Sequence, residues 1–267
     1  MSDILEKICA DMRVHVEKAK ILKPFDLMHR EALRAPQPRG FARALRDKNE
    51  QDGVAFITEI KKSSPSTGLI RDPFSPQSLA QAFEAAGAAC LSVITNQAYF
   101  QGYNEDLIEA RSACDLPVLR KDFTLDVWQV AEARAIGADC ITLIMAALDD
   151  ATADALHQAA MGYGMDVLIE VHTHEELTRA LKLPSRLIGI NSRNMKTLKV
   201  DLRNAAEIAR AVPPERFIIA ESGIHTPTDV VTMHKSGARG FLVGEHLLKQ
   251  PDVGAALHTL RGKYSTI

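Results

Sequence analysis

The hydrophobic and polar positions of the chain follow a repeating order from about residue 53 onward. A short run rich in Val, Ile and Leu is followed by a stretch with helical spacing, and the pair then repeats. The repetition predicts a parallel sheet, and the nearly continuous apolar runs predict strands buried on both faces. The runs are Val54–Ile60, Ala89–Thr95, Pro117–Lys121, Cys140–Met145, Val167–Val171, Leu187–Asn191, Phe217–Ala220 and Gly240–Val243. Eight such units in 267 residues favour an α/β fold of the closed (β/α)8 type, a TIM barrel, over an open sheet.

Helix-start signals occur between the apolar runs. Ser75-Pro76 is typical of an N-cap followed by the first helical residue. Thr173 and Glu176 have the spacing of a capping box, and so do Thr226 and Asp229. We therefore expect a helix to begin at each of these three places, between two strands.

The first 50 residues stand outside the repeat. Ile4, Ile8, Met12 and Val16 recur at helical spacing, which predicts an amphipathic helix. Two positions for this segment stay open: a plug packed on the barrel, or a cover over its catalytic mouth. We expect residues 1–50 to be a helical extension within the same domain as a barrel over residues 51–267.

Charge and cysteine content narrow the class of protein. The chain has 32 Lys and Arg against 34 Asp and Glu, a net charge of −2, which argues against nucleic-acid or anionic-membrane partners. The four cysteines form no CxxC pair, which argues against zinc and thioredoxin-like sites. The N-terminus lacks the apolar core of a signal peptide, and no segment reaches transmembrane length. We therefore expect a cytoplasmic protein.

Charged residues gather where the apolar runs end, which is where barrel enzymes carry their active sites. Glu59 and Lys61 are two residues apart and so point to the same side of a strand. Lys121 ends a second run, and Glu170 interrupts a third. Polar residues also end the sixth and seventh runs, at Asn191 and Glu221. A structural ion pair would explain Glu59 and Lys61 but not the other polar residues. Their occurrence at five strand ends favours an active site.

Glycine-containing loops follow the last two runs, at Ser222-Gly223 and Gly244-Glu245. Glycine lets backbone N–H groups approach a ligand, and these two loops build phosphate sites in many barrels. The Glu245 carboxylate would have to face away from a bound dianion. The sequence therefore predicts a phosphorylated small-molecule substrate.

Three histidines lie near the same strand ends. His172 and His174 could be two metal ligands, but two ligands alone make a weak site, and a capping turn explains their spacing better. His225 lies beside a predicted helix cap, which favours a structural role. No metal site is predicted.

Several motifs, in order along essentially the whole chain, resemble those of indole-3-glycerol-phosphate synthases. They are Glu59–Gly68, Ser92–Thr95, Tyr99–Gly102, Leu119–Phe123, Leu168–His172, Gly189–Met195, Ala220–Ile224 and Leu242–Glu245. The block EIKKSSPS together with LRKDF is the most specific part. Two positions depart from the family pattern: Thr67 stands where Lys is frequent, and Asn96 where an acidic residue is common. The chain is too short for the fusion with phosphoribosylanthranilate isomerase that some family members carry.

The resemblance implies a lyase of tryptophan biosynthesis that needs no cofactor and no metal. It would close the ring of 1-(2-carboxyphenylamino)-1-deoxyribulose 5-phosphate, decarboxylate it and dehydrate it to indole-3-glycerol phosphate. The implied catalytic residues are Lys121 as general acid, Glu170 as the group that stabilises a cationic intermediate and orients Lys121, and Glu59 with Lys61 for dehydration. The implied substrate-binding residues are Asn191, Arg193, Glu221, Ser222, Gly223, Gly244, Glu245, Ser64, Pro65, Phe100, Phe123, Leu143 and Leu242.

Three other functions fit parts of the pattern. A Schiff-base aldolase would use Lys121 or Lys61 as nucleophile. An isomerase of the same pathway would share the phosphate site but lack the EIKKSSPS block. A non-catalytic metabolite-binding barrel would not need Lys and Glu at several strand ends. We expect no nucleic-acid or membrane partner, and a monomer with at most weak association with other tryptophan-pathway enzymes.

Overall fold

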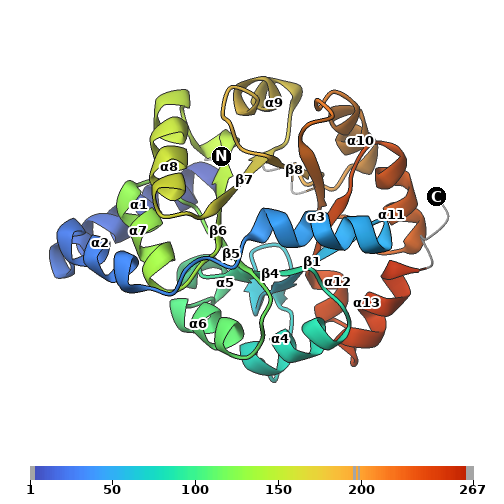
Figure 1. Cartoon of the computed structure of the whole chain (residues 1–267), viewed down its shortest axis with the longest axis horizontal. Helices are drawn as coiled ribbons and strands as arrows, with labels where there is room; N and C mark the ends of the chain where they lie inside the picture. Colours follow the sequence, from blue (N-terminus) through green and yellow to red (C-terminus); the bar gives the residue numbers. More distant parts are fainter. Residues whose placement is uncertain (1–3, 195–196, 198, 263–267) are drawn as a thin grey trace.

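Eight parallel strands close into a ring in the computed structural model, which describes residues 4–194, 197 and 199–262. The ring strands are β1 (Ala55–Ile60), β4 (Cys90–Ile94), β5 (Val118–Lys121), β6 (Cys140–Ile144), β7 (Asp166–Val171), β8 (Leu187–Asn191), β9 (Phe217–Glu221) and β10 (Gly240–Val243). The first and last of them, β1 and β10, pair in register from Ala55↔Gly240 to Thr58↔Val243 and complete the closure (Figure 1). The predicted (β/α)8 barrel is confirmed, and each predicted apolar run coincides with one of these strands to within one residue at either end.

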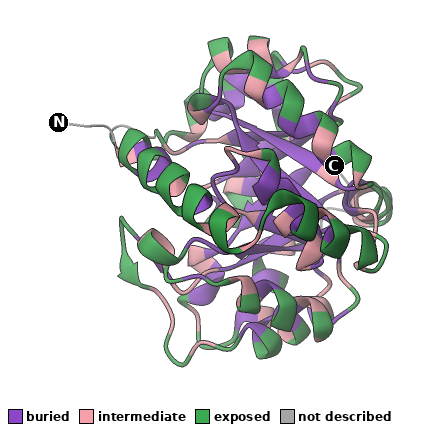
Figure 2. Cartoon of the chain, turned by 90° about the vertical axis from the view of Figure 1, so that its left-hand side faces the viewer, coloured by how far each residue is buried: buried purple, intermediate pink, exposed green. Residues whose placement is uncertain are grey.

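An outer layer of helices surrounds the ring. Its members are α4 (Pro76–Ala85), α6 (Asn104–Ser112), α7 (Val127–Ala135), α8 (Asp150–Gly162), α9 (His174–Ala180), α10 (Leu202–Arg210), α11 (Pro227–Lys235) and α13 (Val253–Arg261). Short elements occupy the loops that follow the strands: the hairpin β2 (Ser63–Ser64) and β3 (Gly68–Leu69), α5 (Gln97–Phe100), the 3-10 turn Met145–Ala147 and α12 (Glu245–Leu248). Buried residues follow the strands and the inner helix faces, and exposed residues cover the outer helix faces (Figure 2).

The predicted helix starts are present, with one change in detail. The Ser75 side chain accepts a hydrogen bond from the backbone N–H of Ser78 and caps α4. Thr226 and Asp229 complete the capping box of α11. Thr173 caps α9, but the second half of its predicted capping box is wrong. Glu176 accepts from the backbone N–H of His172, one residue before the cap, because its carboxylate reaches back past Thr173.

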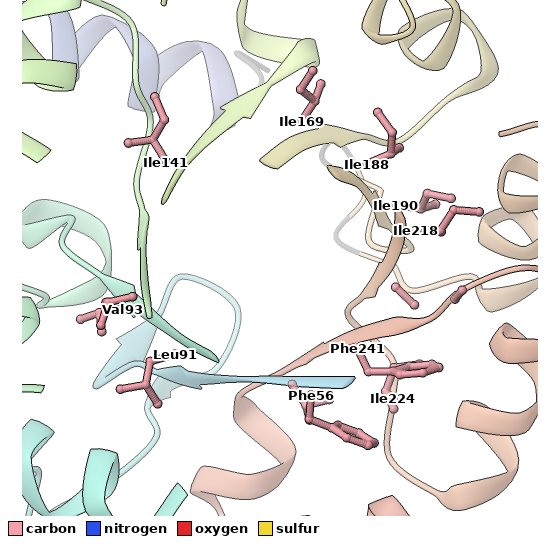
Figure 3. Close-up of a cluster of buried hydrophobic side chains, with 14 of the residues drawn as sticks. Phe56, Leu91, Val93, Ile141, Ile169, Ile188, Ile190, Ile218, Ile224 and Phe241 are labelled. Atoms are coloured by element: carbon pink, nitrogen blue, oxygen red, sulfur yellow. The ribbon is translucent and has the colours of Figure 1, made fainter. Parts of the chain in front are cut away.

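Alternation along the strands separates two layers of side chains. Outward-pointing Phe56, Leu91, Ile141, Ile188 and Phe241 pack between the ring and the helices (Figure 3). Inward-pointing Ile57, Leu119, Leu168 and Ile219 form a second cluster inside the ring. Both layers are almost fully buried. A shift of one residue in any strand would therefore exchange its outward-pointing side chains with its inward-pointing ones.

The N-terminal helices lie at both ends of the ring. Helix α3 (Phe41–Asp52) crosses the end where the strands begin (Figure 1), and its Phe41 and Leu45 are fully buried among the inward side chains. Helix α1 (Ile4–Leu22) packs Leu5 and Ile8 against Phe123 at the other end. The two positions considered for this segment are therefore both occupied, by different helices.

Helix α2 (Phe25–Arg34) joins these two helices and packs along α7, on the side of the barrel. No helix among the described residues is both long enough and apolar enough to cross a membrane.

Candidate active site

A cavity of about 310 Å³ opens at the ends of the strands, under α1. Each of the eight strands contributes a residue near its C-terminal end: Glu59, Ile94, Lys121, Ile144, Glu170, Asn191, Glu221 and Val243. Four of these are ionisable, and the walls between them come from the following loops. The closed ring thus brings the polar strand ends together at one mouth, as predicted.

Lys121 occupies the centre of the ionisable group. Its Nζ donates a short hydrogen bond to Glu170 Oε2 and lies 3.4 Å from Glu221 Oε2. The neighbouring Arg120 points the other way, into the layer between ring and helices, where it binds Glu132 at 2.7 Å. Strand alternation therefore selects Lys121 from the consecutive charges at this strand end and places it in the cavity.

The protonation states of Lys121, Glu170 and Glu221 depend on one another, because both carboxyl groups lie beside the single Lys121 ammonium group. Burial alone would lower the pKa of Lys121, but Glu170 and Glu221 raise it above its ordinary value. Burial likewise opposes ionisation of Glu170, but Lys121 and His172 hold its pKa well below the usual range. Glu221 lies farther from Lys121 Nζ than Glu170 does. Burial, helped by the charges of Glu170 and Glu59, therefore raises the pKa of Glu221 to about 7. The site thus holds a fixed ion pair beside a carboxyl group that titrates near neutral pH.

Glu59 and Lys61 form a second ion pair in the same cavity. Lys61 Nζ donates to Glu59 Oε1 at 2.6 Å, and both side chains are at most 14% exposed. The structural ion pair considered for these residues is therefore present, but it lines the cavity wall. Gly244 makes room for it, since a Cβ there would lie 2.7 Å from Glu59 Oε1.

Two residues of β8 control the carboxylates beside them. Asn191 Nδ2 donates to Glu170 Oε1 at 2.7 Å, while its own Oδ1 accepts from the backbone N–H of Arg193 at 3.0 Å. Gly189 faces Glu221, and a Cβ there would lie 2.1 Å from Glu221 Oε1. Asn191 therefore holds one carboxylate in place, and the missing side chain of Gly189 admits the other.

The two glycine-containing loops lie on one side of the cavity. Ser222 and Gly223 both have positive φ, 64° and 74°, which turns the chain sharply after β9. Ser192 Oγ supports this turn by donating to the Ser222 carbonyl at 2.8 Å. Gly244 precedes α12, so its loop also presents backbone to the cavity.

The Glu245 side chain lies at the rim of this region and is held by Lys249 at 2.6 Å and Thr67 at 3.0 Å. Its negative charge is thereby paired outside the glycine loops. Thr67, one of the two departures from the family pattern, thus joins the loop after β1 to α12.

Apolar side chains line another part of the cavity. Phe100 and Phe123 pack with ring centroids 6.4 Å apart, and Pro65 and Leu242 also belong to the predicted apolar wall. The polar Ser64 lines the cavity next to Pro65. Ile4 and Ile8 of α1 add to it, although no motif identified them as site residues. Their helical spacing indicated a buried face but not what that face covers.

The prediction for Leu143 is wrong. Leu143 belongs to the layer between the ring and the helices, and Ile144 lines the cavity instead. Cys140 belongs to the inner cluster, so alternation along β6 directs residues 142 and 144 inward and 143 outward. Counting in steps of two from Cys140 would have identified Ile144.

The histidines are placed differently from the sequence interpretation. His225, to which a structural role was assigned, lines the cavity beside His246, with ring centroids 5.6 Å apart. His172 is buried beside Glu170, and its position two residues after Glu170, just beyond the end of β7, was the signal for this. Among the described residues no three His, Cys, Asp or Glu side chains are grouped as metal ligands.

Comparison with known proteins relates the chain to one family. The family model for indole-3-glycerol phosphate synthase matches residues 5–260. The indole-3-glycerol phosphate synthase of Azospirillum brasilense is 51% identical over 97% of this chain and 99% of its own length. That of Rhodospirillum rubrum is 52% identical over 98% and 100%.

Solved structures show the same fold at low sequence identity. A 3-hexulose-6-phosphate synthase aligns with a TM-score of 0.64 at 16% identity, covering 78% of this chain and 98% of that one. The tryptophan synthase subunit alpha of Legionella pneumophila aligns with a TM-score of 0.61 at 14% identity, covering 85% and 98%. At such identities the likeness concerns the barrel fold alone.

Proposed function

The chain belongs to the indole-3-glycerol phosphate synthase family, and from this premise we propose how its residues carry out the reaction. The enzyme is a carboxy-lyase of tryptophan biosynthesis. It converts 1-(2-carboxyphenylamino)-1-deoxyribulose 5-phosphate into indole-3-glycerol phosphate, carbon dioxide and water. The observation that carries the assignment of roles is the position of Lys121, held between Glu170 and Glu221 at the centre of the cavity.

The substrate lies across the cavity with its phosphate at the glycine loops and its aryl ring at the apolar wall. Backbone N–H groups of Ser222, Gly223, Gly244 and Glu245 bind the phosphate, supported by the sharp turn after β9. The aryl ring packs against Pro65, Phe100, Phe123 and Leu242, with Ile144 in the place first assigned to Leu143. Ser64, Asn191, Arg193 and Glu221 contact the polar groups between these two ends.

Ring closure depends on Lys121. The aromatic carbon that bears the carboxylate attacks the ketone carbon, and the carbonyl π electrons move to the oxygen, which takes a proton from the Lys121 ammonium group. The raised pKa of Lys121 keeps this proton in place until negative charge develops on the oxygen. The bond to the carboxylate then breaks, its electron pair restores the aromatic ring, and carbon dioxide leaves. Glu170, held ionised, stabilises the positive charge delocalised onto the ring nitrogen in between.

Dehydration depends on the second ion pair. Lys61 donates a proton to the departing hydroxyl group, and Glu59 removes a proton from the adjacent CH₂ carbon, whose electrons form the new double bond. The 2.6 Å hydrogen bond between the two side chains then returns the proton from Glu59 to Lys61. The pair therefore ends the step in the state in which it began.

The Schiff-base alternative is disfavoured by the same geometry. A nucleophilic lysine must lose its proton, whereas the carboxylates around Lys121 raise its pKa. Borohydride treatment in the presence of the keto-phosphate substrate should therefore leave the protein without a covalent adduct, as judged by intact-protein mass spectrometry. A mass increase on Lys121 or Lys61 would contradict the proposal.

We also propose that the enzyme acts as a monomer in the cytoplasm, at most weakly associated with other enzymes of its pathway. The four cysteines are buried free thiols, as in a reducing compartment. Light scattering coupled to size-exclusion chromatography tests the oligomeric state. A stable dimer at micromolar concentration would contradict it.

The two-step assignment is tested by separating carbon dioxide release from indole formation. In a single turnover, Glu59→Gln should still release carbon dioxide but form the indole fluorophore at least about a hundredfold more slowly. Lys121→Met should slow both together, because ring closure precedes both. Equal loss of both signals in Glu59→Gln would show that Glu59 acts before decarboxylation, contrary to the proposal.

A further inference from the structure

A buried imidazole follows β7 directly, and the proposed reaction does not use it. His172 lies two residues beyond Glu170, just after the last residue of the strand, and its ring lies beside the Glu170 carboxylate. The imidazole is 6% exposed and lies between two carboxylates. Its Nε2 is 3.2 Å from Glu170 Oε1, and its Nδ1 is 3.1 Å from Glu176 Oε2.

Glu176 fixes this imidazole from the other side. It lies in the first turn of α9, and its Oε2 accepts the backbone N–H of His172 at 2.7 Å in addition to Nδ1. Thr173 caps the helix by accepting from the backbone N–H of Glu176 at 3.1 Å. With Nδ1 directed at Glu176, the ring can only present Nε2 to Glu170.

A capping role does not account for this arrangement. The cap itself is completed by the Thr173 hydroxyl, and it needs no imidazole at position 172. His174 lies in the same turn and is exposed, whereas His172 is buried. Burying an imidazole between two carboxylates is costly unless the three charges are paired. This buried imidazole lies next to Glu170, to which we assign a catalytic role.

We propose that His172, held by Glu176, is a positioning residue that keeps Glu170 ionised and directed toward Lys121 and the substrate. This inference rests on the proposed role of Glu170. The groups form a row of alternating charge that runs from the surface of α9 into the cavity: Glu176, His172, Glu170, Lys121 and Glu221. Asn191 secures the same oxygen of Glu170 from β8 but brings no charge.

The ionisation states agree with this role. Burial alone would lower the pKa of His172, but Glu170 and Glu176 raise it to about 10, so the ring is cationic at neutral pH. The cation in turn lowers the pKa of Glu170 and, more weakly, that of Glu221 across the cavity. Lys121 acts on both carboxylates in the same direction. Removal of the imidazolium should therefore shift the titration of the catalytic carboxylates to higher pH.

The test compares His172→Gln with His174→Gln, a matched change two residues away in the same turn. We expect His172→Gln to lower kcat about tenfold with KM within about twofold, and to move the acidic limb of the kcat–pH profile upward by about one pH unit. His174→Gln should leave both unchanged. A residue that only supported the turn would alter the melting temperature without moving the pH limb.

A second variant keeps the test decisive if His172→Gln does not fold. Glu176→Gln retains the imidazole but removes the charge that holds it, and should move the same limb in the same direction by a smaller amount. If the folded variants at 172 and 176 both match His174→Gln in kcat and pH profile, the positioning role is wrong. Failure of the underlying scheme is recognised separately, because Glu170→Gln would then retain the activity of the unmodified enzyme.

Discussion

The two ends of the barrel bury carboxylates in opposite ways. At the end closed by α3, Asp139 is fully buried and accepts from the backbone N–H groups of Arg39 at 2.8 Å and Val118 at 2.7 Å, and from Arg111 at 3.1 Å. At the cavity end, Glu221 is equally buried, yet within the described part of the chain its Oε1 has no hydrogen-bond partner. The fold thus supplies hydrogen-bond donors to Asp139, whereas Glu221 Oε1 can still accept a hydrogen bond from a ligand.

This difference separates stability from function along the same strands. A buried charge that is fully hydrogen-bonded ties elements together, as Asp139 ties the segment before α3 to β5. A buried charge that is incompletely bonded costs free energy in the empty enzyme and gains it back only when a ligand supplies the missing contacts. The buried carboxylate at the closed end therefore ties elements together, whereas the one at the cavity end can still accept a hydrogen bond from a ligand.

The largest effect is expected at the centre of the cavity. Lys121→Met removes the proton donor for ring closure and should lower kcat about a thousandfold. The fold should remain, because its closed end is untouched. Indole fluorescence gives the rate, and circular dichroism gives the melting temperature. Near-normal turnover would refute the role of Lys121.

The mirror-image change lies at the closed end. Asp139→Ala leaves several buried donors unpaired and should lower the free energy of unfolding by about 3 kcal/mol. Turnover per folded molecule should stay within about twofold of the unmodified enzyme, because Asp139 is at the opposite end of the strands. Denaturant titration and active-site-normalised rates measure the two quantities. A large loss of kcat in folded protein would break the separation between the two ends.

A smaller effect is expected at Gly189, where the backbone makes room for the Glu221 carboxylate. Gly189→Ala places a Cβ 2.1 Å from the present position of Glu221 Oε1, so this carboxylate has to turn away. We expect kcat to fall about tenfold, the cost of about 1.4 kcal/mol. The control is Gly162→Ala, because a Cβ at Gly162 meets no atom within 4 Å. Equal activities of the two variants would show that the orientation of Glu221 does not matter.

The smallest effect concerns pH. Because the pKa of Glu221 is raised to about 7 in the folded enzyme, its contribution favours folding below pH 4.5 and is lost as the pH rises through 7. Glu221→Gln should therefore be more stable than the unmodified enzyme at pH 8, on the order of 1 kcal/mol, and the gain should vanish near pH 4. Thermal melts across this range measure the difference. A gain that is constant with pH would contradict the buried, ionising carboxyl group.

Prediction from sequence succeeded where the signal was local. Apolar runs, helix caps and strand alternation depend on neighbouring residues, so all eight strands and the inward direction of Glu59, Lys61 and Lys121 were predictable. The error at Leu143 arose where the alternation along β6 was not applied. His172 was assigned to the helix cap, although it lies only two residues beyond Glu170 and its ring contacts that carboxylate.

The sequence by itself determined which residues lie at each strand end and on which side of the strand they point, because sterics and the two-residue period act over a few residues. Only the tertiary structure decided which of these side chains meet. Lys121, Glu170 and Glu221 come from β5, β7 and β9, and their contacts exist because the ring closes with one particular register between strands. The same closure sent α3 to one end and α1 to the other. No spacing along the chain encodes those distances, since they are set by the packing of the whole barrel.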